Sequence, residues 1–435
     1  MRSPRLRKGY ISLRNSGISR ESFVKGAGVA AAALGAGFPA FIPRLGEAAE
    51  TIKIGQIDSL SGPYGAAGLN QVRGADMAVE AWNKRGGVMG RKIEKLVEDD
   101  QTNPGIGVQK ARKLANEERV AAFIGTVSSA VTLSVSGTAA AMNIPFVDAG
   151  GHTDDAVGKD CRWCTFMTCH TTWMMTHATG FSIAKLFGKR WYEVTPDYAF
   201  GHSIAAGYAD VVEKVGGTIV ANDLAPLGTT DFSPYLTKIE AAKPDVIIVT
   251  VSSQDYVNFM KQAGSFGLLK KFPVAGWAAE LESVWALPPE YRVGYYGSEW
   301  YYNSDLVYSK KNAQASNFVR EWRKRYGFPA TERSCFGYVA ADRLLWAMNE
   351  TKSTDAEKVA RALEGSTFQS LWEGTPSYRK IDHSLIWPVW FGKLRPNGTP
   401  QDKFDVMEIV DEQEGEKVAL SASDAGRVCH LNYPS

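Results

Sequence analysis

The stretch that decides the fold of this chain lies at residues 121–131 and reads AAFIGTVSSAV. A short apolar run ends at Gly125, passes through small hydroxyl residues and continues into Ala- and Val-rich sequence. This order is typical of a buried parallel strand, a tight turn and the start of a helix. Ser128 and Ser129 then fall where the first helical N–H groups have no partner and the helix dipole is positive. The corner can be an anion site, suited to a carboxylate, or a simple helix cap.

Strands and helices alternate outward from this corner. In the first half we expect strands at residues 51–58, 93–98, 120–124 and 144–147, and helices at 68–82 and 105–116. The pattern then starts again, with strands at residues 191–195, 245–251 and 272–275 and a helix that ends at Lys214. We therefore predict an α/β protein with two doubly wound parallel-sheet lobes. The strand ends of the two lobes would share one ligand cleft.

Charge is distributed unevenly along the 435 residues. Residues 1–49 carry a net charge of +6, so the remainder carries −4 within a total of +2. A mildly acidic body without a basic aromatic stripe argues against a nucleic-acid partner. The length fits about two domains.

The first 49 residues have the organisation of an export signal. A basic segment ends at Lys25, an Ala- and Gly-rich apolar run follows at residues 26–41, and small residues occur around 46–49. The apolar run is too short and too weakly hydrophobic to span a bilayer. Residues 19–25 resemble the twin-arginine motif with Glu21 in place of the second arginine, and a general secretory signal is the alternative. We expect cleavage near residues 46–50 and a periplasmic mature protein.

Five cysteines would then enter an oxidising compartment, where one or two disulfides are expected. Their pairing stays open; they are Cys161, Cys164, Cys169, Cys335 and Cys429. Residues 161–170 also allow a zinc site, but no second ligand pair lies at metal-site spacing. A disulfide with ordinary core packing is the favoured interpretation, and neither a metal nor a cofactor is expected.

Several short motifs in order make the family resemblance specific. They are KIG at 53–55, LSGP at 60–63, GA at 74–75, GG at 86–87, EDD at 98–100, DYAFG at 197–201 and TDFS at 230–233. With the corner at 125–129, the chain from residue 51 onward resembles the branched-chain amino-acid type of ABC-transporter substrate-binding protein. That family has the class I periplasmic-binding fold. The resemblance implies two lobes joined by three crossovers, a monomer, and docking on a membrane permease.

The resemblance also implies where a ligand binds. Its carboxylate would be held by Ser128 and Ser129 and by the loop that contains Gly151, His152 and Thr153. His152 occupies or adjoins the position where the family has a threonine.

The opposite wall of the cleft is expected to come from the second half of the chain. Phe200 stands where many amino-acid binders have a tyrosine, so this wall is less polar. Ser252 and Trp277 follow strands and are further candidates for ligand contact. Glu280 lies near the family's ammonium-binding acid but does not align with it, and we interpret it as a surface residue.

These inferences define a function and a domain plan. The N-terminal lobe would comprise residues 51–171 plus 299–380, and the C-terminal lobe residues 172–298 plus 381–435. The protein would capture a small organic acid, either an amino acid or an aromatic or aliphatic carboxylate, and deliver it to the permease. The alternatives are a ligand-sensing receptor domain on the same fold and an exported serine hydrolase using Ser128 with His152. The sequence has no G-x-S-x-G nucleophile elbow, no phosphate-loop lysine motif and no dinucleotide-binding glycine motif after the first strand. We therefore expect no enzymatic activity.

Overall fold

The computed structural model describes residues 50–277, 280–303, 312–371 and 374–434. The expected export signal at residues 1–49 lies outside this part of the chain. Within the described ranges no helix combines the length and the apolar character needed to cross a membrane.

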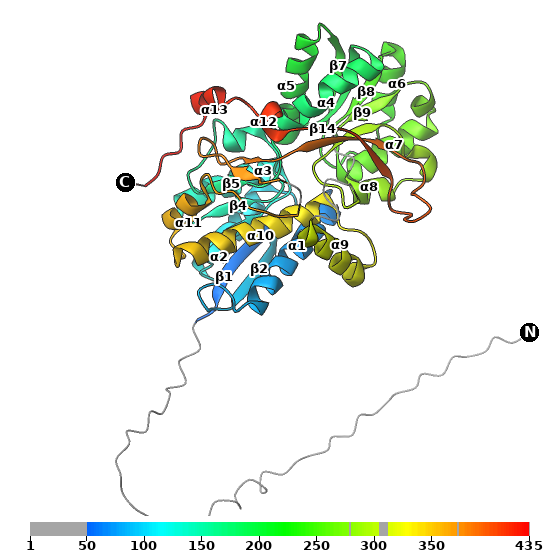
Figure 1. Ribbon diagram of the computed structural model, residues 1–435. Coiled ribbons are helices and arrows are strands. Elements are labelled where there is room, and N and C mark those ends of the chain that lie inside the picture. Colours follow the sequence, from blue (N-terminus) through cyan, green and yellow to red (C-terminus); the bar gives the residue numbers. More distant parts are fainter. Residues whose placement is uncertain (1–49, 278–279, 304–311, 372–373, 435) are drawn as a thin grey trace, which may run out of the picture. The chain divides into compact units, whose positions relative to one another are not determined.

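The first sheet is entirely parallel and has the strand order β2–β1–β3–β4–β5. Its strands are β1 (Ile52–Asp58), β2 (Ile93–Asp99), β3 (Phe123–Gly125), β4 (Phe146–Asp148) and β5 (Thr165–Met167). Around it lie α1 (Gly65–Lys84), α2 (Pro104–Asn116), α3 (Ser129–Ala141), α9 (Ala313–Tyr326), α10 (Glu332–Thr351) and α11 (Ala356–Leu363), with the 3-10 helix η1 (Asp154–Val157) (Figure 1). The strand order changes direction at β1 and β3, where ligands bind in doubly wound sheets.

The second sheet repeats this strand order and then adds two strands. Its order is β14–β13–β10–β9–β8–β6–β7, and β13 and β14 are antiparallel to their neighbours. The strands are β6 (Arg190–Pro196), β7 (Thr218–Ala225), β8 (Val246–Val249), β9 (Val274–Gly276), β10 (Tyr295–Ser298), β13 (Val389–Leu394) and β14 (Met407–Gln413). The predicted fold class is confirmed, whereas the two antiparallel strands were not predicted.

The remaining elements accompany the second sheet or connect the two. They are α4 (Thr172–Phe187), α5 (Ala199–Lys214), α6 (Ser233–Ala242), α7 (Ser253–Ser265), α8 (Leu281–Trp285), α12 (Gly415–Val418), α13 (Ala422–Val428), η2 (Leu268–Lys270), η3 (Pro289–Tyr291) and the small ladder of β11 (Ser377–Tyr378) with β12 (Leu385–Ile386). All four residues of β8 are buried and apolar, as expected for a central parallel strand.

Helices α1 and α10 lie side by side in backbone contact (Figure 1). A Cβ atom on Gly74 of α1 would lie 2.0 Å from the Ser334 carbonyl oxygen, and one on Gly337 would lie 1.9 Å from the Gln71 carbonyl oxygen. No other residue type leaves room for this approach. The contact brings the start of α10, and with it Arg333, to the carboxyl ends of the strands.

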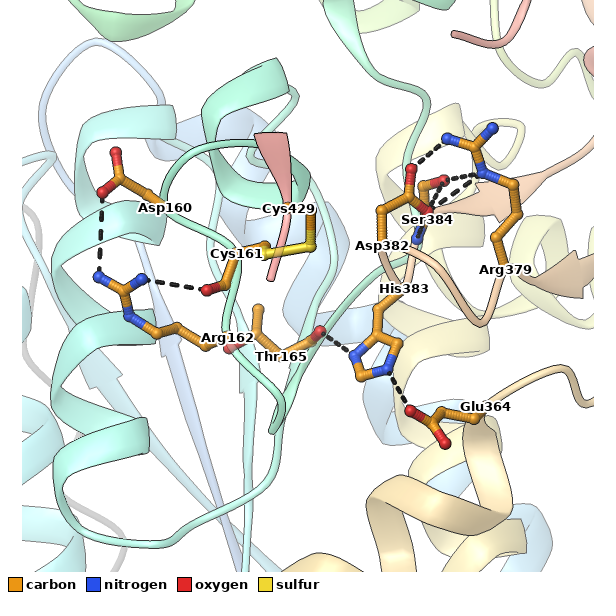
Figure 2. The surroundings of a disulfide bond; sticks show 10 residues. All are labelled: Asp160, Cys161, Arg162, Thr165, Glu364, Arg379, Asp382, His383, Ser384 and Cys429. Carbon is orange, nitrogen blue, oxygen red and sulfur yellow. Dashed lines mark hydrogen bonds and ion pairs between the residues drawn. A yellow bond between two sulfur atoms is a disulfide. The ribbon is translucent and has the colours of Figure 1, made fainter. Parts of the chain in front are cut away.

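One disulfide joins Cys161, just before β5, to Cys429, just after α13 (Figure 2). It spans 268 residues of sequence. Beside it the His383 ring lies between the Thr165 carbonyl oxygen, at 3.0 Å, and the Glu364 carboxylate, at 3.1 Å. The expected disulfide is therefore present, and Cys164, Cys169 and Cys335 are free, buried thiols.

Candidate functional site

A cavity lies where the carboxyl ends of strands from both sheets meet, and its volume is about 40 Å³. Elements around the first sheet contribute Tyr64, Val127, Ser129, His152, Glu332 and Arg333. Elements of the second sheet contribute Tyr198, Phe200, Ser252, Trp277, Glu280, Leu281, Gly297, Ser298, Glu299 and Met407. A volume of this size holds at most a few water molecules, so a larger ligand enters only when the walls move.

Helices α1, α3, α5, α7 and α10 all begin at this cavity. The lining residues stand at or beside their first turns: Tyr64 before α1, Ser129 in α3, Phe200 in α5, Ser252 before α7 and Arg333 in α10. The first N–H groups of a helix have no intrahelical partner, and the dipole makes this end positive. Their convergence places several partly positive helix starts around one enclosed space, an arrangement that can bind an anion.

The Ser128–Ser129 corner has the predicted strand, turn and helix. Ser128 is the N-cap residue, but its side chain makes no capping hydrogen bond. The first helical bond runs from Thr132 N–H to the Ser128 carbonyl oxygen, at 2.8 Å. Among the described residues, none hydrogen-bonds to the Ser129 hydroxyl or to the N–H groups of residues 129–131. The corner therefore offers free donors at the cavity wall.

Arg333 and Glu280 form a buried ion pair across the cavity. The Arg333 Nε and Nη2 atoms lie 2.8 Å and 2.6 Å from Glu280 Oε1, and Nη1 donates to the Gly150 carbonyl oxygen at 3.1 Å. The Ser253 hydroxyl donates to the other oxygen of Glu280. Burial alone would lower the pKa of Arg333, but the negative charges of Glu280 and Glu299 outweigh it and raise that pKa. The guanidinium therefore stays charged.

Glu299 forms a second buried cluster with two histidines. Its Oε1 accepts from the His170 backbone N–H at 2.8 Å and lies 3.1 Å from His170 Nδ1, while its Oε2 lies 3.5 Å from His152 Nε2. Burial would raise the pKa of Glu299, but the two histidines and Arg333 bring it below the usual value. Burial lowers the pKa of His152 to about 4, so this ring is neutral at pH 7.

The other acidic residue of the lining, Glu332, differs from these two. Burial raises its pKa well above the usual value, and the neighbouring carboxylates of Glu282 and Glu280 raise it further.

Aromatic side chains form much of the remaining wall. The Tyr64 hydroxyl contacts the Tyr198 hydroxyl at 2.5 Å and the Ser252 hydroxyl at 2.9 Å, which joins elements of the two sheets across the cavity. Trp277 lies directly over Gly297 of β10, where an added Cβ would come within 1.8 Å of the indole ring. Gly297 thus allows the indole to lie flat against the strand.

Five of the sequence-predicted site residues line the cavity: Ser129, His152, Phe200, Ser252 and Trp277. The other three do not. Ser128 begins α3, Gly151 donates its N–H to Asp148 at 3.0 Å, and Thr153 caps η1. The Gly151 N–H group and the Thr153 side chain serve the local turns, and Ser128 contributes its carbonyl oxygen to the first hydrogen bond of α3.

The interpretation of Glu280 as a surface residue is wrong, because it is 6% exposed and pairs with Arg333. Sequence reasoning also missed Arg333, Glu299, Tyr64 and Tyr198. Tyr64 and Tyr198 lie in loops that follow predicted strands. Because ligands bind beyond the carboxyl ends of the strands in such sheets, both residues could have been predicted as site residues. Arg333 follows no strand, and it reaches the cavity through helix packing.

The segment at residues 161–170 forms part of the core rather than a metal site. Cys161 is in the disulfide, Cys164 and Cys169 are buried, and His170 hydrogen-bonds to Glu299 and to the Trp387 carbonyl oxygen. In the described part of the chain no group of three or more His, Cys, Asp and Glu side chains is arranged to hold a metal ion.

Comparison with known proteins agrees with this architecture. The family model described as "Periplasmic binding protein" matches residues 51–399. Leu/Ile/Val-binding protein homolog 7 of Brucella suis biovar 1 is 28% identical over 330 residues, which cover 73% of this chain and 81% of that protein.

Two solved structures show the similarity in three dimensions. An amino acid ABC transporter substrate-binding protein from Pseudomonas fluorescens Pf-5 has a TM-score of 0.79 and 26% identity, covering 88% of this chain and 100% of that one. A solute binding protein from Rhodopseudomonas palustris BisB5, in complex with 3,4-dihydroxybenzoic acid, has a TM-score of 0.75 and 21% identity, covering 84% and 98%. The second likeness concerns the fold alone. With two doubly wound sheets, a cavity at their strand ends and a family model matched over residues 51–399, this chain belongs to the periplasmic binding protein family.

Proposed function

We propose that this protein captures a small organic acid in the cavity and delivers it to an ABC-transporter permease without transforming it. The observation that carries the proposal is the convergence of several helix starts and the Arg333 guanidinium on one enclosed space. These groups bind an anion by electrostatics and hydrogen bonds. Relatives that are named as Leu/Ile/Val-binding or amino-acid binding proteins support the class of ligand.

The direct test is a thermal-shift screen of amino acids, aromatic acids, short aliphatic acids and neutral amides. An acid present at 100 times its dissociation constant is expected to stabilise the folded protein by about 2.7 kcal/mol. Neutral amides of the same shape serve as the control. If the amides raise the melting temperature and no acid does, the proposal is wrong.

Family membership implies an exported, periplasmic protein. We further propose that residues 1–49 are the export signal, cleaved near residues 46–50, and that the mature protein works as a monomer.

We propose that the two lobes are residues 51–171 with 299–380 and residues 172–298 with 381–435. His170, beside the first proposed crossover, contacts Glu299 at the second and the carbonyl oxygen of Trp387, a few residues after the third, and these contacts support the division. A ligand that contacts both sides of the cavity favours the closed arrangement. We expect the radius of gyration from small-angle scattering to fall when a stabilising acid saturates the protein. An acid that gives no thermal shift is the control, and unchanged scattering at saturation would contradict hinge closure.

Ser129→Ala should weaken acid binding, because it removes one hydroxyl donor at the start of α3. A charge-assisted hydrogen bond contributes about 1.5–3 kcal/mol, so the dissociation constant should rise by roughly one to two decades in isothermal titration calorimetry. Ser134→Ala is a matched control on the same helix, because its hydroxyl donates to the Ala130 carbonyl oxygen and does not line the cavity. Wild-type affinity in Ser129→Ala would show that this serine is only part of the helix start.

A further inference from the structure

We propose that residues 419–434 form a fourth connection between the two lobes, and that the Cys161–Cys429 disulfide makes this connection permanent and limits the opening of the hinge. This restraint is separate from ligand capture and rests only on the two-lobe division proposed above. It follows from the path of the chain after β14 and from the contacts at each end of that path.

The chain passes between the two sheets three times before it reaches this segment. It leaves the first sheet after β5, returns after β10, and leaves again after the β11–β12 ladder. The ladder belongs to the first-sheet side, because its Ser384 is bridged to Met167 of β5. The chain then builds β13 and β14 in the second sheet. These three passages are the crossovers expected of the hinge.

The segment starts from an anchor on the second lobe. Helix α12 precedes it and packs against α4 (Figure 1). Val418 of α12 lies in the buried apolar cluster that also contains Met174 of α4 and Phe391 of β13. Two residues later the Leu420 carbonyl oxygen accepts from Arg379 Nη1 at 2.6 Å, and Arg379 lies between β11 and β12. The chain therefore crosses back to the first lobe at about residues 418–420.

The rest of the segment is held on the first lobe. Cys429 is bonded to Cys161, just before β5 (Figure 2). Beyond this bond the Tyr433 hydroxyl donates to Glu364 Oε1 at 2.6 Å, and the centroid of the Tyr433 ring lies 5.3 Å from that of Trp163. Both cysteines and Trp163 are buried. The segment is thus fixed at both ends, by packing on the second lobe and by a covalent bond on the first.

A fourth connection of this kind reduces the freedom of the hinge. Hinge motion is absorbed by backbone rotation in the few residues that cross between the lobes. A crossing segment that is fixed at both ends has to deform or detach when the lobes rotate. Hydrogen bonds such as those of Leu420 and Tyr433 break and re-form in local openings of the native protein, whereas a disulfide does not. The bond therefore decides whether the segment can be released.

The bond lies at the opposite end of the first sheet from the cavity. Cys161 precedes β5, whereas the cavity lies beyond the carboxyl ends of the strands, and neither Cys161 nor Cys429 lines it. An effect of the bond on the cleft therefore has to pass through movement of the lobes.

Pulsed electron paramagnetic resonance between the lobes of the ligand-free protein measures this movement. Nitroxide labels on ketone-bearing amino acids at the exposed positions 84 of α1 and 261 of α7 leave every cysteine unmodified. Dithiothreitol reduces the bond to two thiols and is itself oxidised to a cyclic disulfide. We expect reduction to lengthen the mean distance between the labels by at least about 2 Å, the scale of domain rearrangements, and to broaden its distribution. The double variant Cys161→Ala, Cys429→Ala should show the longer distance without reductant.

Tyr433→Ala is the matched control, because it removes contacts beyond the bond and leaves the two cysteines joined. It should keep the wild-type distance. An unchanged distance in the reduced, folded protein overturns the proposal, and so does an equal lengthening in Tyr433→Ala. If the double variant does not fold, the reduced wild type, checked by circular dichroism in the same buffer, decides the question. Unfolding on reduction would show that the bond holds the fold rather than the hinge. Acid capture is judged by the thermal-shift screen, so either proposal can fail without the other.

Discussion

Removal of the Cys161–Cys429 disulfide is expected to lower the free energy of unfolding by about 4 kcal/mol. The bond closes a loop of 268 residues, and the entropy that it removes from the unfolded chain grows with loop length, reaching about 4.7 kcal/mol at 100 residues. Measured losses of stability are often smaller than the chain-entropy model predicts, so we expect about 4 kcal/mol. Urea unfolding of the double variant Cys161→Ala, Cys429→Ala against the oxidised wild type measures it.

Reduction provides the control for the disulfide prediction. Dithiothreitol should bring the wild-type protein to the stability of the double variant and leave the double variant unchanged. The free thiols of Cys164, Cys169 and Cys335 are the same in both proteins. A double variant as stable as the oxidised wild type would show that the C-terminal segment is held by its other contacts, such as the packing of Tyr433 against Trp163.

Replacement of Glu193 by Gln is expected to stabilise the protein, and increasingly so as the pH rises. Glu193 lies in the middle of β6, is 1% exposed, and neither carboxylate oxygen has a hydrogen-bond partner in the described structure. Burial raises its pKa from 4.5 to about 8. Between these two values the unfolded chain ionises and the folded protein does not, so wild-type stability falls as the pH rises.

The size of this effect follows from proton linkage. One pKa unit corresponds to about 1.4 kcal/mol, so Glu193→Gln should gain about 1 kcal/mol at pH 5 and about 4 kcal/mol at pH 8. Urea unfolding of both proteins at the two pH values measures the difference. The exposed Glu213 on α5 offers a control, because Glu213→Gln should change stability little at either pH. A gain that is equal at pH 5 and pH 8 would mean that Glu193 does not titrate in this range.

The sequence alone was enough to determine the α/β class and the corner at residues 121–131. Apolar runs that end at glycine or small hydroxyl residues report burial and turn formation locally, so β3, the helix start at Ser129 and the repeat of the pattern at β6 could all be read from them. In doubly wound sheets ligands bind beyond the carboxyl ends of the strands, and this rule correctly predicted that Ser129, Ser252 and Trp277 line the cavity. These features are set by residues close together in the sequence, so the pattern of apolar and polar residues is enough to predict them.

Only the tertiary structure decided which charges meet in the cavity. Arg333 reaches Glu280, 53 residues away, because Gly74 and Gly337 let α1 and α10 touch. Glu299 meets His170 across 129 residues, and Cys161 meets Cys429 across 268. Such pairs leave no periodic trace in the chain, since their energy comes from desolvation and partners that exist only after folding. For the same reason Glu280 reads as a surface acid in the sequence and becomes half of a buried ion pair in the fold.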